Sequence, residues 1–357
     1  MRLLVEGMSG AVIDLKPAED ETEDLDALIY AIIPQSVQPT KESIPMMNRR
    51  SFLGAGSLAL FAAGCQTPGG SGCCAAKAAC KKVPFKFGMA GYTFNKFNAD
   101  RTLDLVQALD VHYLCIKNFH LPFDSTPAQI AEFKKKCADH DITGYGVGPI
   151  YMASNEEAKK AFDYAAAIGV KTVVAVPTEE KEMEVDGKKK KVRFHSRARC
   201  EYLSGLCKEY DMRIAIHNHG PDIPYCFPTG ESAFEMVKDL DPRMGLCLDI
   251  GHDFRAGKNP AETIRKYGSR IYDMHVKNVS FDPKKNIARP MPRGEISIPD
   301  VVRALCEVGY AGCCSLEYER FPMVGEGKNK KLDEALFLRE VAESVGYFRG
   351  VIDCVRG

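Results

Sequence analysis

Four short apolar runs in the second half of the chain each end in side chains that can bind a metal ion or move a proton. Each run is bounded by turn residues and is too short for a helix, so it predicts a buried strand. In chain order, the side chains at their ends are His217 with His219, Asp249 with His252, His275 with Lys277, and Glu317 with Glu319. A parallel barrel brings the C-terminal ends of its strands to one mouth, where groups far apart in sequence meet. The pattern therefore predicts a metal centre built by four consecutive strands.

The chemistry that such a centre supports is proton abstraction next to a carbonyl group. A divalent ion on the carbonyl oxygen draws electrons toward it and acidifies the neighbouring C–H bond. The candidate ligands are the metal-ligand side chains at the four strand ends, among them His217, Asp249, His275 and Glu317. The predicted catalytic groups are Glu317 as a ligand that also acts as a base, His219 and His252 as proton carriers, and Lys277 as a donor to an enolate oxygen. A single strand histidine is more often packed than catalytic, so the prediction depends on the whole set.

Substrate contacts are expected at the ends of the first two predicted strands. The candidates there are Tyr92, Lys117 and His120. Glu319 is expected to face the same way as Glu317 but to lie farther out. Tyr145 and Tyr151, near the third strand, are expected to be packing residues.

The body of the chain, residues 85–357, alternates strand-like apolar runs with amphipathic helix-like segments. The clearest helices are predicted at residues 126–140, 155–168, 197–210 and 231–240. The hydroxyls of Thr126 and Ser154 are typical helix starts, and a hairpin is predicted within residues 182–194. Eight strands and about eight helices match a single parallel (β/α)8 TIM barrel. An open doubly wound sheet has the same alternation, but no glycine-rich dinucleotide motif follows the first strand.

Composition favours a small-molecule partner. The 357 residues are 45% hydrophobic, and 48 Lys and Arg balance 48 Asp and Glu. A neutral chain lacks the positive charge with which nucleic-acid binders neutralise phosphates. The 14 cysteines are scattered, and several fall in predicted buried strands, so most are expected to be free thiols.

The first 84 residues differ in character from the body. Residues 1–45 are acidic and weakly patterned, which indicates a solvated tail or an extension upstream of a start at Met46 or Met47. Residues 46–65 resemble a twin-arginine export signal that ends in a lipoprotein-type Cys65, with Ala62 in the place where leucine is usual. Residues 66–84 are rich in small residues and predict a flexible tether. The chain is therefore expected to be exported, either periplasmic or held at the membrane by a lipid on Cys65.

Several motifs together resemble the xylose isomerase-like TIM barrels known as sugar phosphate isomerases/epimerases. In order, they are His-Asn-His-Gly-Pro from His217, Leu-Asp-Ile-Gly-His ending at His252, His-Val-Lys-Asn from His275, Arg-Gly-Glu-Ile-Ser-Ile from Arg293, and Leu-Glu-Tyr-Glu ending at Glu319. The resemblance covers about residues 85–356 and implies a sugar or polyol substrate with a divalent metal ion. The family's ligands on strands six, seven and eight match Asp249, His275 and Glu317.

The chain departs from this family at strand five, where His217 stands in place of the usual glutamate. A neutral imidazole makes the site less anionic, which favours manganese, cobalt or zinc over magnesium. The expected function is a metal-dependent sugar isomerase or epimerase that works through an enediol-like intermediate. Because the second carboxylate is missing, a lyase or glycoside-cleaving enzyme acting next to a 3-keto group is the alternative. A carbohydrate-binding lipoprotein without turnover is a third possibility from a different class.

Overall fold

The computed structural model describes residues 3–6, 12–15, 83–185, 188–221 and 226–356. The chain divides into two units, Met1–Ala75 and Ala76–Gly357. In the first unit, β1 (Leu3–Glu6) and β2 (Val12–Leu15) form an antiparallel pair. The predicted signal at 46–65 and nearly all of the tether at 66–84 lie outside the described residues. Export and lipidation of Cys65 therefore stay predictions.

The second unit is built on a closed barrel of eight parallel strands. They are β3 (Lys86–Ala90), β4 (Tyr113–Ile116), β5 (Thr143–Met152), β6 (Thr172–Val185), β8 (Arg213–His217), β9 (Met244–Asp249), β10 (Ile271–Val276) and β13 (Cys313–Leu316). Each strand pairs in parallel with its neighbour, and the β5–β6 and β13–β3 pairings complete the ring. The (β/α)8 barrel predicted from the sequence is confirmed, and the open sheet is wrong.

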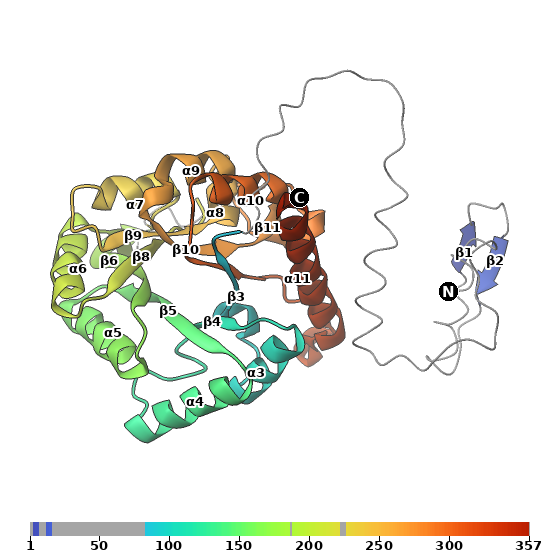
Figure 1. Cartoon of the computed structure of the whole chain (residues 1–357), viewed down its shortest axis with the longest axis horizontal. Coiled ribbons are helices and arrows are strands. Elements are labelled where there is room, and N and C mark those ends of the chain that lie inside the picture. The colour runs from blue at the N-terminus through green and yellow to red at the C-terminus, as the bar shows by residue number, and fades with distance from the viewer. Residues whose placement is uncertain (1–2, 7–11, 16–82, 186–187, 222–225, 357) are drawn as a thin grey trace, which may run out of the picture. The chain divides into compact units, whose positions relative to one another are not determined.

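Helices surround the barrel, as Figure 1 shows. They are α3 (Ala99–Ala108), α4 (Pro127–Asp139), α5 (Asn155–Ile168), α6 (Arg197–Glu209), α7 (Gly230–Val237), α8 (Ile250–Arg255), α9 (Pro260–Tyr267), α10 (Ile298–Glu307) and α11 (Glu334–Arg356). Thr126 and Ser154 cap α4 and α5 in reciprocal capping boxes with Gln129 and Glu157, as their sequence positions predict. Within the described ranges, no helix combines the length and apolar composition needed to cross a bilayer.

The main apolar core fills the space between the strands and the helices. Phe337 and Phe348 of α11 are fully buried there. Burial of one such side chain contributes about 1.5–3 kcal/mol. The ring of Phe337 lies 6.2 Å from that of Phe94, in the 3-10 helix η2 (Gly91–Phe94), and 5.9 Å from that of Tyr318. Helix α11 therefore supports the segments that follow β3 and β13.

The predicted cysteine chemistry is also confirmed for the described residues. The ten cysteines among them are free, and most are buried. Cys115, Cys247, Cys313 and Cys314 lie in barrel strands and pack as small apolar side chains.

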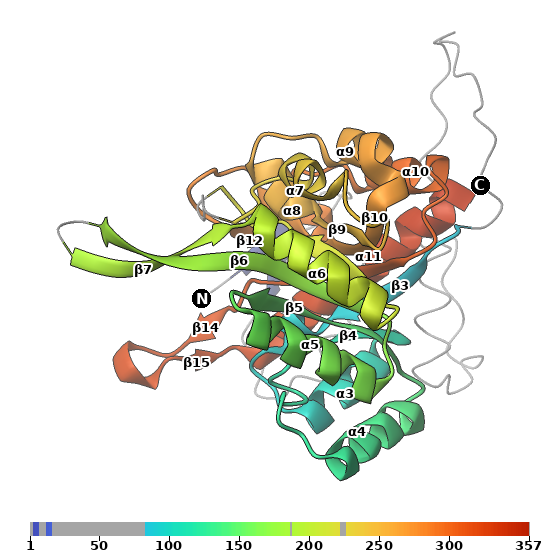
Figure 2. The ribbon, with the colours of Figure 1, turned by 90° about the vertical axis from the view of Figure 1, so that its left-hand side faces the viewer.

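The predicted hairpin forms a long antiparallel ribbon from β6 and β7 (Lys188–His195). Figure 2 shows this ribbon extending away from the barrel. Glutamates on β6 pair with lysines on β7, as in Glu182 with Lys191 and Glu184 with Lys189. Short antiparallel pairs also form between β11 (Asn278–Ser280) and β12 (Ile287–Arg289), and between β14 (Met323–Val324) and β15 (Lys331–Leu332).

Candidate metal centre and substrate cavity

Four buried side chains at the C-terminal ends of the barrel strands face one point. His217 and Asp249 are the last residues of β8 and β9, His275 is the last but one of β10, and Glu317 directly follows β13. One donor atom from each side chain lies within 4.8 Å of the other three. The structure thus brings together the four residues that the sequence predicts as metal ligands.

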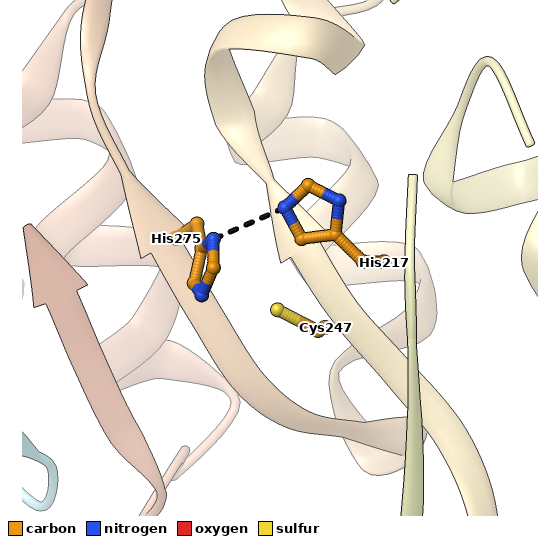
Figure 3. Close-up of side chains that lie close together, drawn as sticks. All are labelled: His217, Cys247 and His275. Atoms are coloured by element: carbon orange, nitrogen blue, oxygen red, sulfur yellow. Dashed lines mark hydrogen bonds between the residues drawn. The ribbon is translucent and has the colours of Figure 1, made fainter. Parts of the chain in front are cut away.

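The two histidines form the closest contact in this group. His217 Nε2 lies 3.0 Å from His275 Nδ1, and Figure 3 shows the two rings facing each other with Cys247 beside them. His217 Nε2 lies 3.5 Å from Asp249 Oδ2, and His275 Nδ1 lies 3.2 Å from Glu317 Oε2. The four donor atoms are therefore close enough together to bind a single metal ion.

The backbone that carries Glu317 is held by Thr93 in η2, the 3-10 helix that follows β3. The Thr93 hydroxyl donates to the Leu316 carbonyl at 3.2 Å and accepts the Tyr318 N–H at 3.1 Å. Because these two bonds lie on either side of Glu317, they fix the direction of its carboxylate.

Lys277 places a positive charge among the carboxylates. Its Nζ lies 2.8 Å from Asp249 Oδ2, 3.0 Å from Glu317 Oε2 and 2.5 Å from Glu319 Oε2. Burial opposes its charge, but these carboxylates, Asp249 foremost, raise the pKa of Lys277 well above its ordinary value. Burial likewise opposes the charge on Glu317, yet Lys277 and then His275 lower the pKa of that carboxyl. Lys277 and Glu317 are therefore both charged at neutral pH.

Helix α8 begins directly after Asp249 and brings His252 to the centre. Asp249 Oδ1 caps the helix by accepting the His252 backbone N–H at 2.9 Å. The His252 ring lies between two cations, with Nε2 3.3 Å from Lys277 Nζ and Nδ1 3.3 Å from Arg255 Nη1. Arg255 is only 1% exposed and donates to the Asp282 carbonyl. This buried arginine, which the sequence reading missed, fixes the ring of His252.

A cavity of about 370 Å³ lies at this end of the barrel. The predicted site residues that line it are Tyr92, Lys117, His217, His219, His252, Glu317 and Glu319. Tyr151 also lines the cavity, and its hydroxyl lies 3.1 Å from His219 Nε2. The expectation that Tyr151 is a packing residue is wrong, because β5 continues to Met152 and carries Tyr151 to the mouth.

The three predicted substrate contacts separate into two groups. Lys117 and Tyr92 both line the cavity, with Lys117 Nζ 5.8 Å from the Tyr92 ring centroid and 2.7 Å from the Pro149 carbonyl. His120 is buried and is not among the lining residues of this cavity, because its Nε2 lies 3.1 Å from Thr102 Oγ1 on α3. The chain turns after Ile116 and places the His120 ring against the helix instead.

A polar layer inside the barrel, below the four donors, was also missed from the sequence. Tyr145 donates its hydroxyl to Asp273 Oδ1 at 2.9 Å and lies 2.6 Å from Ser315 Oγ. The expected packing role of Tyr145 is therefore only part of its contacts. Burial raises the pKa of Asp273 to about 6, against the opposing effects of His275 and Tyr145.

The donor set fits a divalent metal ion. Imidazole nitrogens and carboxylate oxygens are ligands that zinc, cobalt and manganese accept. Burial lowers the pKa of His217 to about 4, so its ring is neutral at neutral pH and has a lone pair to offer. The remaining ring nitrogens, Nδ1 of His217 and Nε2 of His275, are buried and have no hydrogen-bond partner in the described part of the chain. His217 Nε2 and His275 Nδ1 lie next to the carboxylates of Asp249 and Glu317, so these two nitrogens are the ones that face the ion.

We expect the metal-free protein to lose stability as the pH falls from about 6.5 toward 4. Burial lowers the pKa values of His217, His219 and His252 from 6.5 to about 4, 3 and 4. In this range the unfolded chain binds protons that the folded chain excludes, which costs up to about 1.4 kcal/mol per pH unit for each histidine. Urea denaturation at several pH values should give a shallower decline for His219→Asn than for the natural chain. Equal slopes for the two chains would contradict the exclusion of protons from His219.

Comparison with known proteins places this geometry in context. The model of the family described as xylose isomerase-like TIM barrel matches residues 103–341. Inosose dehydratase from Geobacillus kaustophilus (strain HTA426) is 26% identical over 135 residues, which are 33% of this chain and 43% of that protein. Inosose dehydratase from Clostridium tetani (strain Massachusetts / E88) is 28% identical over 137 residues, 34% of this chain and 45% of that protein. The matched part of the chain spans about half the length of each of these curated relatives.

Two solved structures share the fold. D-psicose 3-epimerase from Clostridium cellulolyticum H10, solved with D-tagatose, has a TM-score of 0.59 and 19% identity, covering 75% of this chain and 99% of its own. The IOLI protein with a bound zinc atom has a TM-score of 0.56 and 24% identity, covering 76% of this chain and 98% of its own.

Proposed function

The chain belongs to the xylose isomerase-like TIM barrel family, and from this we propose that it is a metal-dependent enzyme that removes a proton next to the carbonyl group of a sugar or cyclic polyol. One observation carries the proposal: His217, Asp249, His275 and Glu317 converge, buried, and two of them, His217 and Glu317, line a cavity. The named curated relatives are inosose dehydratases, and one structural neighbour is a D-psicose 3-epimerase solved with D-tagatose, which supports this substrate class.

The ion that these residues would hold supplies Lewis-acid polarisation of the substrate carbonyl. Glu317 is the proposed base, because its carboxylate is charged and lines the cavity. It takes the proton from the carbon beside the carbonyl; the C–H electron pair forms a C=C bond, and the carbonyl π pair moves onto the oxygen to give an enolate. Lys277 is proposed to stabilise the enolate oxygen. Its Nζ contacts Asp249, Glu317 and Glu319 and does not line the cavity, so the enolate oxygen would replace one of these carboxylates as its acceptor.

The metal is proposed to be zinc, cobalt or manganese rather than magnesium. Magnesium prefers oxygen ligands and retains its waters, whereas this donor set contains two imidazoles. The zinc-bound IOLI protein, which shares the fold, is consistent with this choice.

Isomerisation or epimerisation is one proposed outcome for the enolate. It requires a second group that returns a proton at another carbon or on the other face. His219 and His252 line the cavity and are the candidates. Tyr151 lies 3.1 Å from His219 Nε2 and can pass a proton to or from that ring.

Elimination is the second candidate outcome, favoured by two specific observations. His217 ends β8, the fifth strand of the barrel, where a carboxylate would serve as the second base. The named curated relatives are inosose dehydratases. In an elimination the enolate electrons expel a hydroxyl or alkoxyl group from the next carbon. The Tyr151 hydroxyl, which lies 3.1 Å from His219 Nε2, would supply the proton that this leaving group requires.

Product analysis in deuterated water tests both outcomes. The metal-loaded protein is incubated with D-fructose, D-tagatose and inosose, with a metal-stripped sample as the control. We expect deuterium at the carbon beside the carbonyl with the metal-loaded protein alone. A deuterated isomer or epimer supports the first outcome, and an unsaturated product supports the second. Sugar binding with neither deuterium exchange nor an unsaturated product would contradict the proposal and favour a non-catalytic carbohydrate-binding protein.

A further inference from the structure

A buried carboxylate lies in the barrel interior where aliphatic side chains are usual. The interior layers of TIM barrels are filled mainly by valine, isoleucine and leucine. Asp273 on β10 occupies such a position and is fully buried. It precedes His275 by two residues, so both side chains point to the same face of the strand. A carboxylate in this place costs solvation free energy, and its contacts must offset that cost.

The two oxygens of Asp273 face different partners. Oδ1 accepts the hydroxyl of Tyr145 at 2.9 Å, and Tyr145 is itself braced by Ser315 Oγ at 2.6 Å. Oδ2 receives a weak thiol contact from Cys247, whose Sγ lies 3.6 Å away, and it lies 3.9 Å from His275 Nε2; the Met274 backbone N–H also donates to this carboxylate. The carboxylate is therefore anchored on one side and has acceptor capacity left on the side of His275.

The two ring nitrogens of His275 face different groups. Nδ1 faces the metal centre, 3.0 Å from His217 Nε2 and 3.2 Å from Glu317 Oε2. Nε2 points away from His217 (Figure 3); the thiols of Cys115 and Cys247 lie near this ring, and no nitrogen or oxygen atom of the described residues hydrogen-bonds to Nε2. A neutral imidazole carries its proton on one nitrogen only. An ion at Nδ1 needs the lone pair there, so the proton must then lie on Nε2.

We propose that Asp273 is a positioning residue that accepts the Nε2–H of His275 and so presents the Nδ1 lone pair to the metal ion. The inference rests on the proposed metal centre. The gap of 3.9 Å is too long for a hydrogen bond, and closing it to a bond of about 2.9 Å requires a movement of roughly 1 Å. Hydrogen bonds of this kind from a metal-ligating histidine to a carboxylate fix the ring and its tautomer.

A second ion inside the barrel is the competing interpretation. Donor atoms of Cys115, Asp273 and His275 also lie within 4.8 Å of one another. Tyr145 already occupies one oxygen of Asp273, and Cys115 Sγ contacts the Gly148 carbonyl at 3.7 Å. These contacts favour a hydrogen-bonded layer over a second set of ligands.

The test compares metal affinity with folding stability in Asp273→Asn. Zinc and cobalt affinities are measured by chelator competition, and the stability of the metal-free protein is measured by urea denaturation. We expect Asp273→Asn to bind each metal about 10- to 100-fold more weakly, with unchanged or higher metal-free stability, because a buried carboxylate is removed. In the zinc-loaded natural chain, the nitrogen NMR spectrum of His275 should show a protonated Nε2 with a hydrogen-bonded shift, which Asp273→Asn loses.

Asp253→Asn is the matched control. Asp253 is also fully buried, but it accepts hydrogen bonds from Thr263 Oγ1 and the Gly230 N–H, away from the donor set. This variant should keep its metal affinity, whatever its effect on metal-free stability. The proposal is overturned if Asp273→Asn binds metal as tightly as the natural chain, or if both variants weaken binding only in step with lost stability. Two ions per natural chain, one of them lost in Cys115→Ser, would make Asp273 a ligand. A natural chain that binds no ion would refute the metal centre itself.

Discussion

Replacement of Glu317 by glutamine is expected to lower the rate of proton exchange by about 10³-fold, within the range for loss of a catalytic base. The amide keeps an oxygen that can face the ion but cannot accept the substrate proton. Its direction is preserved, since Thr93 bonds the backbone on either side of residue 317. The measurement is the rate of deuterium incorporation at saturating metal, with metal content determined on the same samples. A rate within a few-fold of the natural chain would assign the base elsewhere.

Glu319→Gln separates the loss of a base from the loss of charge near Lys277. Glu319 also pairs with Lys277 Nζ, at 2.5 Å, and lines the cavity, but it is outside the four-donor set. Glu319→Gln removes one negative charge beside the same lysine but leaves the proposed base in place. The variant should therefore lower the exchange rate by at most about 10-fold. Equal losses in the two variants would mean that the charge balance of Lys277, and not proton abstraction, explains the Glu317 result.

The sequence predicted the barrel and the four converging residues because both depend on local regularity. Strand runs that end in His217, Asp249, His275 and Glu317 need only a parallel barrel to bring these side chains together. The two-residue period that places Lys277 beside His275 also places Asp273 one layer below it. Asp273 lies within the strand run and not at its end, so the pattern of strand ends does not single it out.

Other features depend on contacts that the sequence does not contain. Tyr145 reaches Asp273 across the barrel, which requires the register of strands that are far apart along the chain. Arg255 is buried beside His252, although arginine side chains are usually exposed. His120 follows a strand end, as a cavity residue would, but a turn directs its ring to Thr102. In each case the local pattern was correct and the direction of one side chain was set by tertiary packing.

Stoichiometric metal binding is expected to be lost in Asp249→Asn and in His275→Ala. The natural chain should retain about one zinc, cobalt or manganese ion after gel filtration in metal-free buffer, and each variant should retain less than about a tenth of that, as for loss of one of four ligands. Asp249→Asn is the sharper change, because asparagine can still cap α8 by accepting the His252 N–H, which Asp249 now accepts at 2.9 Å. Lys277 also keeps Glu317 and Glu319 as partners, so the fold should survive.

His219→Ala is the matched control for the metal measurement. His219 lines the same cavity and its ring lies 4.7 Å from that of His217, yet it is not one of the four donors. Elemental analysis should therefore find full metal content in this variant. If His219→Ala loses the ion while Asp249→Asn keeps it, the ion lies higher in the cavity, among His217, His219 and His252. Glu317 would then not be a ligand, because it is not part of that histidine group.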